Sequence, residues 1–284
     1  MKFNLSTAEL FVPDGLPPGP ALQRTTHMTV AAHQDDIEIM SAEPILSCFQ
    51  RGDLWFTGVV VTDGRGSPRD DLYGNFTDEE MHSVRFKEQR KAAYVGEYAA
   101  QVLLDYPSKA VKDGSDPRPA EDIARLIEAA GPETVYTHNL ADKHDTHVGT
   151  ALKTIAAIRS LPAGKRPKRL YACEVWRDLD WMTDKDKVPF DVSGHENVQA
   201  ALLGVFDSQI CGGKRYDLAT MGRRKANATY FASHGVDTAA GINFGMDMTP
   251  LILDPSLSPE SFIRGFVRRF EEEVSERLKR LGAR

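Results

Sequence analysis

Two short stretches of this sequence contain the residue types that bind metal ions and transfer protons. The first places His33, Asp35 and Asp36 directly after an apolar run, and the second places His144 three residues before His147. The apolar run is typical of a buried strand, and the polar residues follow it where the chain enters a helix. Ligands of an open α/β sheet bind just beyond the carboxyl ends of its strands. The two stretches together predict a metal site with a base beside it.

The metal ligands predicted from this spacing are His33, Asp36 and His147. Residues three apart at the start of a helix share a face, so His33 and Asp36 can point at one ion. A catalytic zinc ion accepts His nitrogen and Asp oxygen and typically keeps three protein ligands and one water. His147, at the start of a later helix, supplies the third ligand if both strand ends face one crevice. We therefore predict a Zn2+ cofactor, with Fe2+ or another divalent metal as the alternative in a reducing cell.

Asp35 and His144 complete the predicted catalytic set. Asp35 lies between two ligands and is expected to point elsewhere, which suits a general base that takes a proton from a metal-activated water. His144 is expected to stabilise a developing oxyanion or to protonate a leaving amine. A histidine and two acids after a strand are often inert at a protein surface. The occurrence of both stretches after predicted strand ends favours the functional interpretation.

The alternation of strands and helices predicts an α/β fold, with a Rossmann-like, mostly parallel sheet flanked by helices. Strands are expected over residues 27–32, 54–61, 101–104, 134–137 and 170–173. Helices are expected over residues 36–51, 78–98, 119–130 and 146–160. The pattern weakens from residue 174, and the less regular C-terminal region is expected to hold helices over 195–207 and 259–281 and a strand over 249–253.

A single domain is expected to span residues 1–284, because no stretch of the sequence looks like an interdomain linker. Residues 1–25 are rich in Pro and Gly and are expected to form an extended arm rather than a helix. Residues 27–175 form the predicted Rossmann-like core. Residues 176–284 are expected to be a C-terminal extension that completes the domain.

Composition excludes several classes of protein. The chain carries 35 Lys and Arg against 41 Asp and Glu, for a net charge of −6, and it has no long basic block, which argues against nucleic-acid binding. No apolar run approaches the ~20 residues that a membrane-spanning helix needs. The three cysteines form no Cys-x-x-Cys pair, which favours a reducing compartment. Because the N-terminus also lacks the apolar core of a signal peptide, we expect a cytoplasmic protein.

Arg65, Arg85 and Asp142 are the candidates for the substrate side of the site. Arg65 lies in the loop after the second predicted strand, where a guanidinium can meet a substrate hydroxyl or phosphate, or simply face solvent. Arg85 can serve in the same way, although a helix salt bridge with Glu88 is the more common role for such an arginine. Asp142 and His138 lie near the second histidine stretch and could orient a ligand imidazole.

Several stretches resemble the PIG-L / LmbE-like N-deacetylase family. Residues 32–36 (Ala-His-Gln-Asp-Asp) resemble its Ala-His-Pro-Asp-Asp signature, and residues 144–147 (His-Asp-Thr-His) resemble its His-Pro-Asp-His motif. Residues 85–88 (Arg-Phe-Lys-Glu) resemble its Arg-x-x-Glu helix, and residues 206–209 (Phe-Asp-Ser-Gln) resemble a later Ser-Gln segment. The resemblance covers roughly residues 27–210. The first two motifs are specific together, whereas the others are weak alone.

The resemblance implies a Rossmann-like fold, a single deacetylase-type domain and a zinc ion that helps to hydrolyse N-acetyl groups, mostly from N-acetylglucosamine conjugates. His33, Asp36 and His147 match the family's metal ligands. Asp35 matches its general base, and His144 matches the histidine that stabilises the tetrahedral intermediate or assists the leaving group.

The sequence departs from the family's motifs at two positions. Gln34 replaces the usual Pro, which should matter little because its side chain can point away. Thr146 replaces the acidic residue that normally precedes the last histidine. That acid could tune the charge of a histidine, so the change bears on the pH profile rather than on the metal site.

We therefore expect a metal-dependent hydrolase that removes an N-acetyl or other N-acyl group from an amino sugar or its conjugate, by attack of zinc-bound water. One alternative is an amidase that acts on a thiol conjugate or a natural product. Another is a non-catalytic Rossmann-like module that binds a sugar or nucleotide, although no Gly-x-Gly-x-x-Gly follows the first strand. The expected partners are a small N-acetylated molecule and further copies of the chain, because members of this family often form homo-oligomers.

Overall fold

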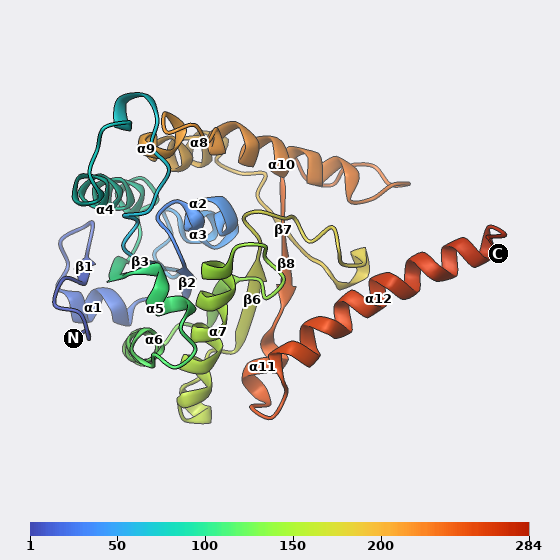
Figure 1. Cartoon of the computed structure of the whole chain (residues 1–284), viewed down its shortest axis with the longest axis horizontal. Helices are drawn as coiled ribbons and strands as arrows, with labels where there is room; N and C mark the ends of the chain where they lie inside the picture. Colours follow the sequence, from blue (N-terminus) through green and yellow to red (C-terminus); the bar gives the residue numbers. More distant parts are fainter. Residues whose placement is uncertain (284) are drawn as a thin grey trace.

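A mixed eight-stranded sheet runs through the molecule (Figure 1). The structure is a computed structural model that describes residues 1–283. In spatial order the strands are β1 (Glu9–Phe11), β4 (Ala100–Tyr106), β3 (Phe56–Thr62), β2 (His27–Ala31), β5 (Thr134–His138), β6 (Arg169–Cys173), β8 (Ile242–Asp247) and β7 (Val188–Asp191). The five strands from β4 to β6 are parallel, while β1 and β8 pair antiparallel with their neighbours. The predicted α/β fold with a mostly parallel sheet is confirmed.

Helices cover both faces of the sheet, and each face has its own hydrophobic core. Side chains of β3 alternate between the two, with Val59 and Val61 in the first core and Phe56 and Val60 in the second. The first core receives side chains from α1 (Pro18–Gln23), α5 (Ser108–Lys112), α6 (Arg118–Ala130), α7 (Asp145–Ser160) and α11 (Thr249–Leu253). The second receives side chains from α2 (Asp36–Met40), α3 (Ala42–Cys48), α4 (Asp78–Val95) and α8 (Glu196–Gly204). This double coverage explains the continuous apolar runs of the central strands.

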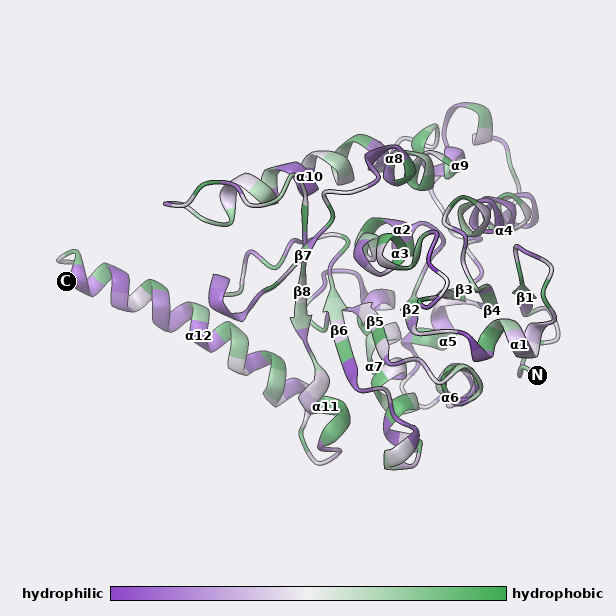
Figure 2. Ribbon diagram, turned by 180° about the vertical axis from the view of Figure 1, so that it is seen from behind, coloured by the Kyte–Doolittle hydropathy of each residue, from purple (hydrophilic) through white to green (hydrophobic). Residues whose placement is uncertain are grey.

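The remaining elements are α9 (Asp207–Ile210), α10 (Tyr216–Tyr230), α12 (Pro259–Arg280) and three short 3-10 turns at η1 (Asp71–Tyr73), η2 (Ala163–Lys165) and η3 (Asp184–Asp186). Figure 2 shows hydrophobic residues concentrated in the central strands, while polar residues dominate the outer helices. Within the described residues, every helix is too short or too polar to span a membrane.

Two expectations for the C-terminal region need revision. The strand expected over 249–253 is wrong, because these residues form α11 and the strand is β8 instead. Pro250 lies in the first turn of α11, where a missing backbone N–H costs nothing. A short apolar run is compatible with a strand and with a buried helix, so the hydrophobic pattern of residues 249–253 could not distinguish the two. Helix α10 was not expected at all.

Two N-terminal expectations also change. Residues 1–25 are not simply an extended arm, because β1 pairs with β4 and Pro18 begins α1. The single helix expected over 36–51 is divided into α2 and α3. Pro44 is the reason for this division, since it has no N–H to donate to the carbonyl of Met40 four residues earlier. Asn243 Nδ2 donates to that Met40 oxygen at 3.2 Å.

Arg224 of α10 ties the C-terminal region to α2. Its guanidinium is 2% exposed and donates to the carbonyl oxygens of Glu38 (2.7 Å) and Ile39 (3.2 Å). The same group donates to Gln199 Oε1 at 2.9 Å and to Asn243 Oδ1 at 3.2 Å. Burial lowers the Arg224 pKa to about 10, so the group remains charged at neutral pH. One buried cation therefore satisfies the free carbonyls of the helix that follows β2.

We predict that Arg224→Met lowers the free energy of unfolding by about 2–4 kcal/mol, because it leaves buried carbonyl groups without donors. Lys225→Met is the matched control. Lys225 makes an exposed ion pair with Glu196 at 2.7 Å, and such pairs contribute about 0–1 kcal/mol. Urea denaturation followed by circular dichroism measures both changes. Equal, small losses in the two variants would show that Arg224 does not hold α2 in place.

Candidate metal centre

The candidate metal centre lies at the carboxyl ends of β2 and β5. These strands are parallel neighbours, with Val30 beside Thr137, so the segments that follow them emerge at the same edge of the sheet. After β2 the chain passes through His33 into α2, and after β5 it passes through a short loop into α7. The strand order reverses between β2 and β5, which is the place where open α/β sheets bind their ligands.

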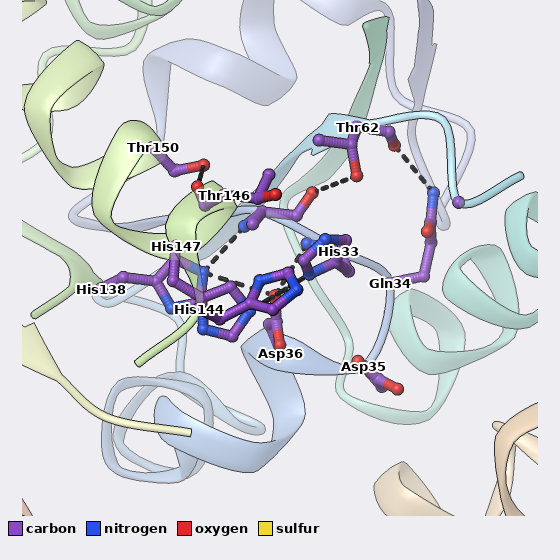
Figure 3. A network of polar contacts seen from close by, with 12 residues as sticks. His33, Gln34, Asp35, Asp36, Thr62, His138, His144, Thr146, His147 and Thr150 are labelled. Carbon is purple, nitrogen blue, oxygen red and sulfur yellow. Dashed lines mark hydrogen bonds and ion pairs between the residues drawn. The ribbon is translucent and has the colours of Figure 1, made fainter. Parts of the chain in front are cut away.

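Three predicted ligand atoms form a nearly equilateral triangle (Figure 3). His33 Nδ1 lies 3.1 Å from Asp36 Oδ2 and 3.2 Å from His147 Nε2. Asp36 Oδ2 lies 3.3 Å from His147 Nε2. Ligands about 2.0–2.1 Å from a tetrahedral zinc ion are separated by about 3.3 Å, so the triangle matches three corners of such a site. His33, Asp36 and His147 could therefore hold a metal ion together.

His138 is a fourth imidazole beside this triangle. Its Nε2 lies 3.3 Å from Asp36 Oδ2, which makes it a geometric candidate for a ligand. The same nitrogen accepts the backbone N–H of Ala32 at 2.8 Å, so its lone pair is already used. Burial lowers the His138 pKa to about 4, which keeps the ring neutral. The ring stacks on His147, with centroids 3.9 Å apart, so we expect it to support that side chain rather than to bind an ion.

Asp142 orients His147. Its Oδ2 lies 3.2 Å from His147 Nδ1, so a proton on Nδ1 leaves the Nε2 lone pair free for a metal. Its Oδ1 accepts the backbone N–H of His144 at 3.0 Å, which fixes the start of α7. Burial acts to raise the Asp142 pKa, but the hydrogen bond and charge of His147 lower it below its ordinary value. Asp142 lies behind the ligand and not on the wall of the cavity.

His147 is strongly basic without a metal. Burial acts to lower its pKa, but the carboxylates of Asp36 and Asp142 raise it to about 10. The Asp36 pKa moves the opposite way, since the surrounding imidazoles outweigh burial and hold it well below its ordinary value. A proton on His147 therefore offsets part of the negative charge of the two buried carboxylates, and a metal that binds there must displace that proton.

Asp35 points away from the imidazoles, as Figure 3 shows, although it also lines the cavity. Its backbone has φ +90° and ψ −32°, a conformation that costs a non-glycine residue about 1–3 kcal/mol. Gln89 Oε1 accepts its N–H at 3.3 Å, and Arg85 Nη2 donates to the carbonyl of Gln34 at 2.5 Å. Burial raises the pKa of the Asp35 carboxyl to about 7, against the opposing effect of Arg85.

A buried network behind Asp35 escaped the sequence analysis. Gln89 Nε2 and the hydroxyl of Tyr98 each donate to Glu38 Oε1 at 2.8 Å. Burial raises the Glu38 pKa to about 8. Gln89 thus links Glu38 to the strained backbone of Asp35. Glu38 and Gln89 lie 51 residues apart on two helices, so the sequence carries no signal that would have identified this link.

The two arginines assigned to the substrate side have different positions. Arg85 is 2% exposed and lines the cavity, with Nη1 3.5 Å from Asp35 Oδ2. It faces Asp35, whereas Glu88 accepts the N–H and hydroxyl of Ser208 at 2.7 Å each. The guanidinium of Arg65 lies among three carboxylates, 3.7–3.9 Å away, and it does not line the cavity. The prediction for Arg65 as a substrate contact therefore has no support in this geometry.

The structure also describes the surroundings of His144 and of Gln34 and Thr146, the two residues that depart from the family motifs. The His144 ring lies 5.0 Å from the ring of His33 on the cavity wall, and burial lowers its pKa. Gln34 points away from the imidazoles, as expected, and donates to the carbonyl of Thr62 at 3.0 Å (Figure 3). The acids that face His147 are Asp36 and Asp142, so the acid missing at Thr146 leaves the hydrogen bonds of His147 intact.

The cavity above the triangle has a volume of about 380 Å3. One wall comes from the loop after β3, and the opposite wall carries the aromatic rings of Trp176 and Tyr216. Cavities of this size accommodate small ligands, with a few polar groups that fix the orientation.

We predict that zinc affinity rises about tenfold per pH unit between about pH 6 and pH 8. The sign follows from the raised pKa of His147: below about 10 its proton competes with the metal, so a higher pH favours metal binding. Competition with a chelator of known pH dependence measures the affinity. His195→Ala, which changes an exposed histidine outside the site, is expected to keep the same slope. An affinity that does not change with pH would contradict the proton displacement.

The chain resembles a known protein family in sequence and several solved structures in fold. The family model described as PIG-L: GlcNAc-PI de-N-acetylase matches residues 28–158, which include both histidine stretches. No curated protein matches the sequence significantly. Among solved structures, the conserved protein TT1542 from Thermus thermophilus aligns over 82% of this chain and 99% of its own, with 16% identity and a TM-score of 0.63.

Two further structures show the same fold. The 4-carboxy-2-hydroxymuconate hydratase GalB from Pseudomonas putida aligns over 79% of this chain and 96% of its own, with 16% identity and a TM-score of 0.61. The N,N'-diacetylchitobiose deacetylase from Pyrococcus horikoshii aligns over 81% and 86%, with 15% identity and a TM-score of 0.58. At these identities the likeness concerns the fold.

Proposed function

We propose that this chain, whose residues 28–158 match the PIG-L family model, is a zinc-dependent hydrolase of an N-acylated amino sugar or its conjugate. The reaction consumes water and an amide and releases a carboxylic acid, acetate in the simplest case, and a free amine. The observation that carries the proposal is the triangle of His33, Asp36 and His147, with a second carboxylate left free beside it.

His33, Asp36 and His147 would hold the zinc ion, which would supply the Lewis acidity that polarises an acyl carbonyl and makes a water molecule more acidic. The remaining steps belong to the side chains of this chain. Asp35 takes a proton from the attacking water, a role favoured by its position on the cavity wall and its raised pKa. His144 has a lowered pKa and is neutral, so its N–H can donate to the oxyanion that develops on the acyl group.

The supporting residues fix the geometry of this chemistry. Gln89 and Arg85 hold the strained backbone that turns Asp35 away from the metal ligands. Asp142 keeps the Nε2 lone pair of His147 directed at the metal. Preorganised groups of this kind lower the barrier because they need no rearrangement during the reaction.

Three observations support an amino-sugar substrate. The family model carries the description GlcNAc-PI de-N-acetylase, and one structural neighbour is a diacetylchitobiose deacetylase. The cavity of about 380 Å3 also has an aromatic wall, which offers an apolar surface to a sugar ring. The hydratase among the neighbours shows that this fold also occurs with other chemistry, so the fold alone does not decide the reaction.

An amine-release screen tests the proposed reaction. The zinc-loaded protein is incubated with N-acetylglucosamine, its glycosides and phosphates, a thiol conjugate and a muconate-type unsaturated acid. We expect free amine and an equal amount of acetate from at least one sugar substrate. Amine release from the thiol conjugate alone would favour the amidase alternative. Loss of the unsaturated acid without amine release would contradict the proposed hydrolysis.

We predict that Asp35→Asn lowers kcat by about 10²- to 10⁴-fold, the usual contribution of a general base, and leaves one zinc ion bound per chain. Asp63→Asn is the matched control, because Asp63 is another carboxylate on the cavity wall and the substitution is the same. Amine release measures turnover, and elemental analysis measures zinc. Near-normal turnover of zinc-loaded Asp35→Asn would remove Asp35 from its role as base.

A further inference from the structure

Helix α12 has 22 residues, and none of them is buried. Its first turns attach to the body through Phe262, Ile263 and Phe266, which are partly buried against the first core. Arg269 Nε donates to Asp186 Oδ2 at 2.8 Å. Within the described residues, no hydrogen bond or ion pair joins the helix beyond Arg269 to the body, and Figures 1 and 2 show it projecting outward. A helical segment of about ten residues is marginal in water without a partner.

The projecting part of α12 carries an apolar seam. Val267, Phe270, Val274 and Leu281 follow the spacing of the a and d positions of a coiled coil. Their exposed fractions include 47% for Val267, 36% for Val274 and 75% for Leu281, and the adjacent Leu278 is 52% exposed. Figure 2 shows hydrophobic bands between the polar bands of this helix. A stripe of this kind is typical of a helix whose apolar face packs against another element.

The charges beside the seam indicate what that element is. An acidic block, Glu271–Glu273 with Glu276, precedes a basic block formed by Arg277, Lys279 and Arg280. Parallel pairing of two such helices would place like charges opposite each other. Antiparallel pairing, centred between Ser275 and Glu276, places the acidic block of each helix against the basic block of the other.

From this complementarity we propose that α12 pairs antiparallel with α12 of a second copy of this chain. The contact is two-fold symmetric, so each interaction occurs twice. Val274 packs against the aliphatic stem of the opposite Arg277, and Phe270 packs against the opposite Leu281. Glu273 of each copy faces Arg280 of the other. The interface does not involve the metal centre and does not depend on the proposed reaction.

Sedimentation equilibrium of the full chain tests the seam. The natural chain is expected to be a dimer or a higher even-numbered assembly. Val274→Lys should weaken the association by about tenfold or more, because it places a second cation against the opposite Arg277 in an apolar seam. Ser275→Lys is the matched control, since it adds the same charge one residue away and off the seam. Circular dichroism confirms that both variants remain folded.

A charge exchange tests the orientation. Glu273→Arg and Arg280→Glu should each weaken the dimer, and the double variant should restore it if the two residues face each other across the interface. A monomeric natural chain would overturn the proposal, and so would a dimer that is insensitive to Val274→Lys. A double variant that fails to recover would overturn the antiparallel arrangement. Binding of a monomer to anionic phospholipid vesicles through α12 would identify a membrane surface as the partner instead.

Discussion

The site depends on one buried carboxylate that requires a positive charge. Asp36 is 2% exposed, and its Oδ2 lies 3.1–3.3 Å from the nitrogens of three imidazoles. An isolated carboxylate in such a place is unfavourable unless it is paired. In the free protein a proton on His147 provides the charge, and a divalent ion provides it when bound. Burial and the charge of His147 keep His138 neutral against the effect of Asp36, and Asp142 lies behind His147 and supports its proton.

A second constraint arises because the side chains of two adjacent residues, Asp35 and Asp36, must point in different directions. Asp35 and Asp36 follow each other in the chain, yet one faces the metal position and the other the cavity. The backbone achieves this through the positive φ of Asp35, and Gln89, Arg85 and the first turn of α2 hold the unfavourable conformation. Arg224, from the far C-terminal region, in turn holds α2. The C-terminal region is therefore part of the support for the site, and its Trp176 and Tyr216 also line the cavity.

The sequence predicted much of this arrangement for physical reasons. Parallel strands that are buried on both faces leave continuous apolar runs in the sequence. The polar residues that follow β2 and β5 mark a common edge of the sheet, so the proximity of His33, Asp36 and His147 could be predicted. Interactions between distant side chains left no such pattern. Three features depend on how distant side chains pack together. They are the hydrogen bond between Gln89 and Glu38, the hydrogen bonds from Arg224 to the carbonyls of α2, and the position of Arg65 outside the cavity lining. The strand expected at 249–253 failed because a short apolar run with a proline suits a first helical turn equally well.

The most direct test of the account is the position of a metal ion in crystals of the zinc-loaded protein. Anomalous difference maps, collected on both sides of the zinc absorption edge, locate the ion independently of the protein density. The account predicts one peak about 2.0–2.1 Å from His33 Nδ1, Asp36 Oδ2 and His147 Nε2, with His138 still accepting the N–H of Ala32. A peak coordinated by His138 or His144, or one bound by Asp35, would contradict the proposed division between ligands and base.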